Sequence, residues 1–179
     1  MTRRRASQAG SVLIVALLVL VVLTLLGLSG ISNTVMQERM ARNMQEALSA
    51  FQAAEAGLRD GEEDVRMNIN PATVFDTSCT NGLCEPSDTG YDVWATTVLV
   101  DWDTDTNTRI YGAGTGVTAL QEVDRQPAYI IERLQVVERG GSIVTGFVSQ
   151  PPSEWYRVTS KGYGRQGQSE AMVQSVVRR

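Results

Sequence analysis

The residues best suited to chemistry in this sequence are its two cysteines, Cys79 and Cys84, which enclose the short run TNGL. The turn-forming pair Asn81-Gly82 lies between them, so the chain can fold back and close a small disulfide loop in an oxidising compartment. In a reducing cytosol the same two residues would instead be free thiols. The choice between these states depends on where the chain resides, and the N-terminal segment described below favours the disulfide.

A second candidate is the acidic segment 101–107, in which Asp101, Asp103 and Asp105 occupy alternate positions. Oxygen ligands at every second residue are typical of the start of a calcium-binding loop. An EF-hand loop also needs glycine at its sixth position and glutamate at its twelfth, where this sequence has Thr106 and Gly112. We therefore interpret the segment as an acidic, solvated turn between strands and assign no metal site, with calcium binding as an open alternative.

The sequence offers few routes to catalysis. It contains no histidine, which removes the commonest general base and most zinc, copper and non-haem iron sites. Its only lysine, Lys161, lies in a predicted strand, so no set of nucleophile, base and orienting residue can be assembled. The run GAGTG at 112–116 matches neither a dinucleotide-binding nor a Walker pattern and is predicted to be a flexible loop. We predict that the protein is not an enzyme, with no catalytic residue and no cofactor.

The charge of the chain argues against nucleic acid as a partner. The formal net charge is −4, and removal of the N-terminal arginines Arg3, Arg4 and Arg5 would make it more negative. A domain of this charge cannot bind nucleic acid by neutralising its phosphates.

The elements that position these residues begin with an apolar segment at the N-terminus. No charged residue occurs between Arg5 and Glu38, and residues 12–31 are almost wholly aliphatic. About 20 apolar residues span a bilayer as a helix, whereas a secretory signal peptide has a shorter apolar core followed by a cleavage site. The basic cluster would hold the N-terminus in the cytoplasm and place the C-terminal domain outside. A plain single-pass inner-membrane anchor with a periplasmic domain is the simplest interpretation.

The residues before the apolar segment support a more specific interpretation. The run RRRASQAGSVLIV is a short basic leader that ends at Gly10, and the apolar helix follows directly. This resembles the leader of type IV prepilins, which a membrane-bound prepilin peptidase cleaves after the glycine and methylates at the new N-terminus. The resemblance implies a leader peptide at 1–10, cleavage after Gly10 and Ser11 as the first mature residue.

One position departs from the pattern of major pilins. That family carries glutamate at the fifth mature position, where the carboxylate neutralises the terminal amine of a neighbouring subunit, but the fifth mature residue here would be Val15. Because a charged group buried among apolar helices is costly unless it is paired, a subunit without this glutamate suits a position where no such partner needs it. Family members that lack the glutamate are minor pilins or pseudopilins, which implies a minor subunit.

The helical pattern continues beyond the apolar segment, and it predicts one helix over 11–66 with its transmembrane part at 12–31. No proline occurs before Pro71 to interrupt it. Residues at three- and four-residue steps trace one apolar face that is expected to pack on a sheet: Met36, Met40, Met44, Leu48, Phe51, Ala54 and Leu58. In the apolar half, the residues expected to pack in a filament core are Val12, Leu13, Ile14, Val15, Gly27 and Gly30.

Gly27 and Gly30 weaken the helix by about 1 kcal/mol each relative to alanine. By resemblance to pilins, this region would melt locally when the subunit enters a filament. Close packing against another membrane helix explains the two glycines equally well.

Two runs within this helix resemble the PilX family of minor pilins: MQERMARN at 36–43 and AFQAAEAGLR at 50–59. WYRVTSKG at 155–162 and VQSV at 173–176 are similar to the closing strands of that family. The resemblance covers the first ~66 residues and the last ~25, and it implies a pilin fold.

Residues 67–179 are predicted to form a β-rich periplasmic domain. Strands are expected at 91–100, 129–137, 155–162 and 171–177, the last two joined as a hairpin around Gly162, Gly164 and Gly167. Four strands in sequence with no intervening helix predict a small, largely antiparallel sheet, covered by the C-terminal half of the long helix. The fold class is α+β.

The sequence therefore predicts a minor pilin that primes or initiates type IV pilus assembly. Its expected partners are other minor pilins, the major pilin, a tip adhesin and the prepilin peptidase, and it would reside in the inner membrane and then in the pilus. Two alternatives stay open: a minor pseudopilin of a type II secretion system, which the short middle region disfavours, and a single-pass periplasmic binding or sensor domain that is anchored but never processed.

Overall fold

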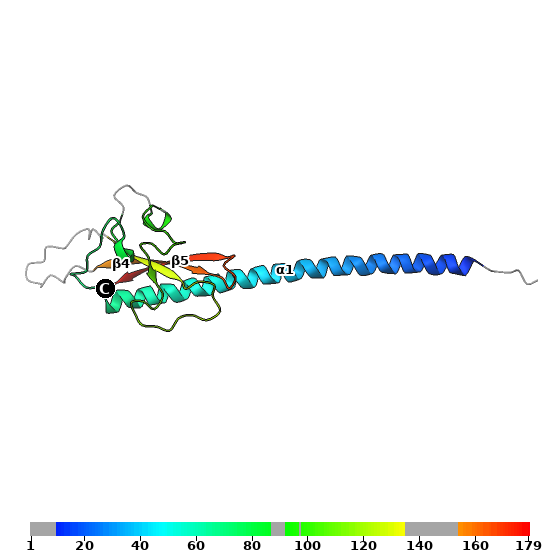
Figure 1. The fold of residues 1–179 in the computed structure, drawn as a ribbon, viewed down its shortest axis with the longest axis horizontal. Coiled ribbons are helices and arrows are strands. Elements are labelled where there is room, and N and C mark those ends of the chain that lie inside the picture. Colours follow the sequence, from blue (N-terminus) through cyan, green and yellow to red (C-terminus); the bar gives the residue numbers. More distant parts are fainter. Residues whose placement is uncertain (1–9, 87–91, 97, 135–153) are drawn as a thin grey trace, which may run out of the picture. The chain divides into compact units, whose positions relative to one another are not determined.

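The computed structural model describes residues 10–86, 92–96, 98–134 and 154–179, and only the backbone of 29–33. The chain divides into two compact units, 1–44 and 45–179. The predicted leader residues 1–9 lie outside the described part. Figure 1 shows the elements of the fold.

Helix α1 runs from Ser11 to Met67, within one residue of the predicted bounds. It ends where the backbone N–H groups of Asn68 and Ile69 both donate to the carbonyl of Asp64, at 2.9 and 3.3 Å. The Asn68 side chain also donates to the Asp64 carboxylate at 2.6 Å. Pro71 follows shortly after, and proline cannot continue a helix.

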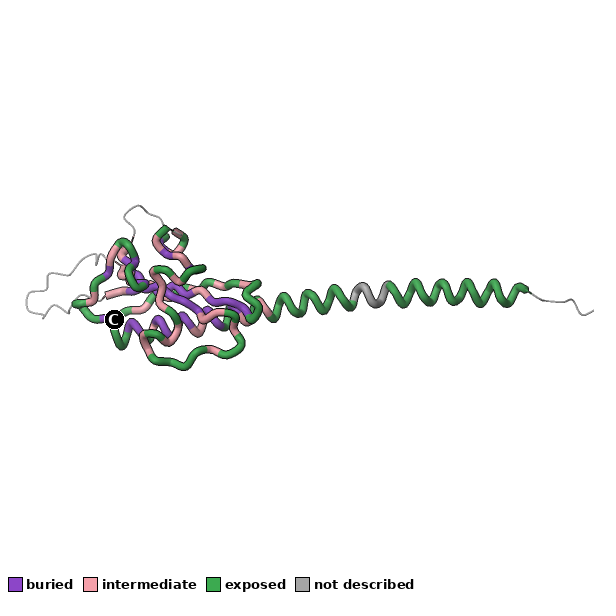
Figure 2. The backbone as a smooth tube through the Cα atoms, viewed as in Figure 1, coloured by how far each residue is buried: buried purple, intermediate pink, exposed green. Residues whose placement is uncertain are grey.

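In the first unit, α1 carries the segment Ser11–Leu28, which is long and apolar enough to cross a membrane and has none of its length buried. In Figure 2 this part of the tube is exposed throughout. A run of exposed aliphatic side chains this long needs a covering of lipid or of other apolar helices.

The second unit contains a five-stranded sheet. Its strands are β1 (Leu83–Cys84), β2 (Arg109–Ile110), β3 (Ala128–Leu134), β4 (Trp155–Tyr163) and β5 (Glu170–Arg178). The order is β1-β3-β4-β5, and β2 also pairs with β3. The pairs β3–β4 and β4–β5 are antiparallel, as predicted. The two short strands β2 and β1 were not predicted: β2 pairs with β3 in antiparallel orientation and β1 pairs with β3 in parallel orientation, so the sheet is mixed.

The predicted strand at 91–100 is wrong over its described part, because Val93–Ala95 form the short 3-10 helix η2. Val93 and Val100 are buried in a cluster on the sheet, with Trp94 partly buried against it, whereas Val98 is exposed. The indole of the nearby Trp102 donates to the Trp94 carbonyl at 3.0 Å. Strand-like composition here reflects burial rather than a backbone preference. The predicted strand over 129–137 is confirmed to Leu134, and its last three residues lie outside the described part.

Each face of the sheet carries its own hydrophobic core. On one face, α1 packs over a cluster of Leu58, Val65, Ile69, Phe75, Tyr129, Ile131, Tyr156 and Val158. On the other, the loops before β3 pack over a cluster of Cys79, Cys84, Val93, Val100, Trp102, Ala128 and Ile130. The buried residues are concentrated where α1 and the sheet meet (Figure 2).

The face of α1 that meets the sheet differs from the predicted stripe. Met36, Met40, Met44, Leu48 and Phe51 are exposed, whereas Ala54 and Leu58 are buried, together with the small residues Ala50, Ala53, Gly57 and Gly61. Small residues let the helix backbone approach the strands closely. A Cβ atom on Gly162 would lie 2.1 Å from the Ala54 nitrogen, so α1 and β4 touch backbone to backbone.

Candidate functional site

The junction between the predicted leader and the helix lies at Gly10. This residue is exposed and has φ +125°, a conformation that residues with a side chain rarely adopt, and α1 begins at the next residue, Ser11. The Ile14 N–H reaches the Gly10 carbonyl at 3.5 Å. The structure thus places a helix start at the position where the sequence predicts cleavage, and the cleavage itself stays a prediction.

The predicted filament-core residues Val12, Leu13, Ile14 and Val15 are all exposed on the first turn and a half of α1. Among the described residues, nothing lies within 4 Å of a Cβ atom built on Gly27. Gly30 lies within the helix. Val12, Leu13, Ile14, Val15 and Gly27 therefore contribute to an exposed apolar surface within the first unit, which suits lipid or other apolar helices.

The predicted disulfide bond between Cys79 and Cys84 is present, with 4.2 Å between the two Cα atoms. Both cysteines are fully buried, and the loop between them turns through positive φ angles at Asn81 and Gly82, as the Asn-Gly pair predicts. Asp76 anchors the loop by accepting hydrogen bonds from the Ser78 and Thr80 N–H groups at 2.9 and 3.1 Å. The hydrogen bond from the Thr80 backbone lowers the pKa of Asp76.

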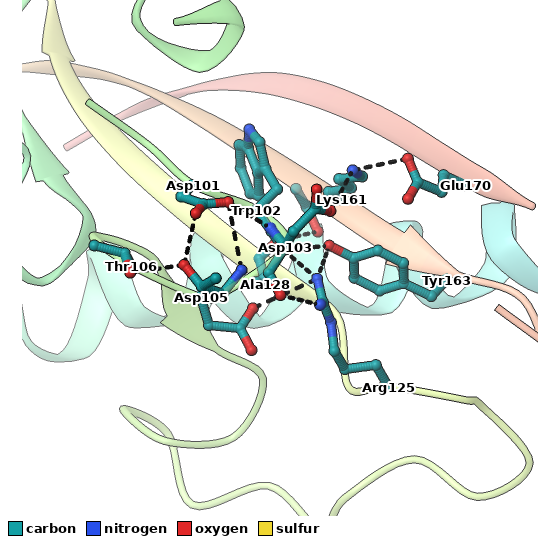
Figure 3. Close-up of polar contacts among 12 residues, drawn as sticks. Asp101, Trp102, Asp103, Asp105, Thr106, Arg125, Ala128, Lys161, Tyr163 and Glu170 are labelled. Atoms are coloured by element: carbon teal, nitrogen blue, oxygen red, sulfur yellow. Dashed lines mark hydrogen bonds and ion pairs between the residues drawn. The ribbon is translucent and has the colours of Figure 1, made fainter. Parts of the chain in front are cut away.

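The acidic segment 101–107 folds into a turn, closed by two backbone hydrogen bonds of 3.1 Å between Asp101 and Thr106 (Figure 3). The Asp101 carboxylate accepts from the Asp103 N–H at 2.9 Å and from the Thr104 hydroxyl at 2.7 Å. The hydrogen bond from the Thr104 side chain lowers the pKa of Asp101. The Asp101 carboxylate therefore accepts hydrogen bonds from its own turn.

The other two carboxylates of this turn face cations. Asp103 lies 3.9 Å from the Lys161 amine, and Asp105 lies 3.7 Å from the Arg125 guanidinium. Arg125 stacks 4.0 Å over the ring of Tyr163, whose buried position raises the pKa of that tyrosine to about 12. Within the described ranges, no three acidic or cysteine side chains lie close enough together to hold a metal ion. The arrangement fastens the turn to the sheet.

Helix α1 carries two buried aspartates, Asp60 and Asp64, that were not predicted from the sequence. Asp64 is fully buried, accepts a hydrogen bond from the Tyr129 hydroxyl at 2.9 Å and pairs with the Arg109 guanidinium at 2.7 Å. Burial raises the pKa of Tyr129. Asp60 accepts from the Gly112 N–H at 2.7 Å and from the Thr115 hydroxyl.

The GAGTG run is therefore docked on the helix instead of forming the flexible loop that the sequence predicts. A Cβ atom on Gly114 would lie 2.7 Å from a carboxylate oxygen of Asp64, so glycine permits the approach. The available signal was the four-residue step between Asp60 and Asp64, which places both carboxylates on one helix face beside Gly57 and Gly61.

A third buried carboxylate lies in the sheet. Glu132 of β3 is fully buried and receives two hydrogen bonds from the Arg157 guanidinium on β4, at 2.7 and 2.8 Å. These hydrogen bonds raise the pKa of Arg157, and Asp92 lies 3.7 Å from the same guanidinium. The two-residue period of β3 places Glu132 on the same face as Ala128 and Ile130, and the packed loops cover this face.

Two family models match the chain. PilX N-terminal matches residues 9–59, and Type IV pilus assembly protein PilX C-term matches residues 80–179. The chain belongs to the PilX family. No curated protein and no solved structure matches it. The C-terminal match begins at residue 80, so it also covers the middle of the chain, where the sequence motifs showed no resemblance to the family.

Membership of the PilX family gives the exposed apolar helix a role. The family belongs to type IV pilus assembly and is a structural component of the pilus. Together with the N-terminal apolar helix, it indicates membrane anchoring and association with the pilus.

Proposed function

We propose that this protein is a minor pilin that primes type IV pilus assembly. The segment 12–31 would hold it in the inner membrane with its domain in the periplasm, and the same helix would then pack into the filament. The PilX family matches over both the helix and the domain carry this proposal. Its expected contacts are other minor pilins, the major pilin and a tip adhesin.

Val15, which stands where major pilins have glutamate, favours a subunit that is present in few copies over one that is repeated along the shaft. In a filament whose shaft subunits pair a carboxylate with a neighbouring terminal amine, valine leaves that amine unpaired in an apolar core. An unpaired buried charge costs several kcal/mol. Repetition along the shaft would incur this cost at every contact, whereas a single copy at the end would not.

The processing step gives the first test. We expect the full chain, expressed with an active prepilin peptidase and extracted from membranes, to begin at N-methylated Ser11 by intact-mass analysis. Gly10→Val should leave it uncleaved, because the side chain conflicts with the positive φ of this exposed junction. The matched change Ser11→Ala, on the other side of the bond, should preserve cleavage. If the wild-type chain is recovered only with its original N-terminus, the protein is an unprocessed anchor.

The priming role gives the second test. Deletion of the gene should reduce surface pili sharply while the major pilin is still made and inserted, and expression of the wild-type chain should restore them. Quantitative mass spectrometry of sheared pili should find this chain at a small fraction of the major subunit. An abundance comparable to the major pilin, or an unchanged number of pili, would contradict the proposal. A secretion defect with normal pili would instead indicate a pseudopilin.

A further inference from the structure

Within the described residues, strand β5 has an open outer edge. It pairs with β4 over all nine of its residues, from Glu170 opposite Tyr163 to Arg178 opposite Trp155. Among the described residues, no strand pairs with its other side. In Figure 1, β5 is the red strand beside β4.

The register shows which backbone groups this edge presents. Glu154 and Arg179 exchange both backbone hydrogen bonds, at 3.3 and 2.9 Å, and the Gly164 N–H donates to Ser169 at 2.9 Å. Because hydrogen-bonded pairs recur at every second residue of an antiparallel ladder, Val173 and Ser175 direct their N–H and C=O groups toward β4. The backbone groups of residues 170, 172, 174, 176 and 178 therefore point outward.

Nothing in the sequence of β5 protects this edge. Natural proteins guard an exposed edge with lysine, proline, a bulge or a very short strand. The run EAMVQSVVR carries charge only at Glu170 and Arg178, and the exposed Met172 and Val176 lie between them. The opposite edge of the sheet is formed by β1 and β2, which have two residues each. In the part of the chain that the structure describes, one edge of the sheet is thus formed by very short strands and the other is open for pairing.

A second copy of this chain does not fit the open edge. Gly162 of β4 contacts Ala54, and Val158 lies beside Gly61, so β4 runs opposite to α1 and β5 runs with it. An antiparallel β5 pair would set the Gln45 ends of two copies at opposite ends of the joined sheet, although both lead to segments that enter one membrane. A parallel pair would bring Glu170 beside Glu170 and Arg178 beside Arg178, which is repulsive.

We propose that the outer edge of β5 is the docking site for an extended segment of a different pilus subunit, which adds to the sheet as one more strand. Backbone hydrogen bonds to alternate residues of β5 would hold the segment, as in other cases of β-strand addition. The partner strand should carry apolar residues beside Met172 and Val176, a basic residue near Glu170 and an acidic one near Arg178. This rests on the proposed function only in that the protein is a pilus subunit, not in that it primes assembly.

Hydrogen exchange of the full chain alone, in detergent micelles, tests whether the edge is free. The amides of Met172, Gln174 and Val176 should exchange fast, and those of Val173 and Ser175, which bond to β4, should exchange slowly. Slow exchange of the first three would mean that the chain covers its own edge, and the proposal would be wrong.

Photo-cross-linking in piliated cells tests the partner. A benzophenone amino acid at position 176 of the full chain should cross-link to another subunit of the same pilus, whereas one at the exposed Val74 should not. A cross-link to a second copy of this chain, or no cross-link to any pilus subunit, would overturn the proposal.

Gln174→Pro tests the backbone contact directly, because the N–H that it removes points outward and the ladder to β4 stays whole. It should reduce the cross-link roughly tenfold or more at an unchanged melting temperature, while Gln174→Ala should preserve it. If Gln174→Pro lowers the melting temperature, Met172→Lys replaces it as the test variant, because it keeps every backbone group. It should reduce the cross-link by a similar factor. Retention of the cross-link in a folded variant would refute strand addition. The two proposals can fail separately. If Gln174→Pro loses the cross-link but deletion of the gene leaves the number of pili unchanged, strand addition is supported and only the priming role is rejected.

Discussion

Replacement of Arg157 with leucine is expected to destabilise the domain by about 3–5 kcal/mol, because it leaves Glu132 as a buried carboxylate without a counter-charge. Glu132 is fully buried, and both of its oxygens accept from Arg157. The loss should exceed the value of the hydrogen bonds themselves, since the uncompensated charge must stay out of water. Urea denaturation of the full chain in micelles, followed by tryptophan fluorescence, measures it.

Two further variants separate charge from packing in this experiment. Arg178→Leu, an exposed arginine on the adjacent strand, should change the stability by no more than about 0.5 kcal/mol. The double variant Glu132→Leu with Arg157→Leu should recover much of the loss, because replacing a whole buried ion pair with apolar residues is often close to neutral. A single-variant loss below about 1 kcal/mol would show that Glu132 reaches solvent or another cation.

The second large effect is expected from Gly162→Ala. The added Cβ atom would lie 2.1 Å from the Ala54 nitrogen and 2.6 Å from the Ala50 carbonyl oxygen, which are backbone atoms and cannot turn away. Helix α1 would have to move off the sheet, at a cost of about 3 kcal/mol or more. Thermal unfolding and limited proteolysis of the full chain should both report it.

Gly27→Ala is the control for this substitution, since nothing among the described residues lies within 4 Å of the new atom. It should leave the melting temperature of the domain unchanged. A Gly162→Ala variant that melts like the wild type would mean that α1 and β4 are not in backbone contact.

The sequence predicted the elements whose causes are local. An uninterrupted run without proline determined α1, and the glycines between two β-rich runs determined the hairpin of β4 and β5. The Asn-Gly pair and the close spacing of Cys79 and Cys84 predicted the loop, and the apolar N-terminal segment favoured the disulfide over free thiols because it indicated an oxidising compartment. For the helix, the hairpin and the turn of the cysteine loop, the signal lies within a few residues of the feature that it determines.

The features that the sequence did not predict depend on contacts between distant segments. Glu132 looks like a surface residue until the loops before β3 are known to cover that face. Val93–Ala95 resembles a strand until it packs on the sheet. The methionine stripe was a misleading guide to the helix face, because Met36, Met40 and Met44 belong to the first unit. Within the second unit, small residues such as Gly57 and Gly61 meet the sheet.

The alignment of α1 with β4 also determines how the domain bears mechanical load. Contacts run along both elements, from Gly162 beside Ala54 to Val158 beside Gly61, so the helix and the strand lie along a common line. Tension applied along the helical segment 45–67 acts parallel to the strands and strains these contacts in shear, all at the same time. Contacts arranged across the line of tension would instead peel open one after another at a lower force. We therefore expect this domain to resist tension along its helix better than tension across it.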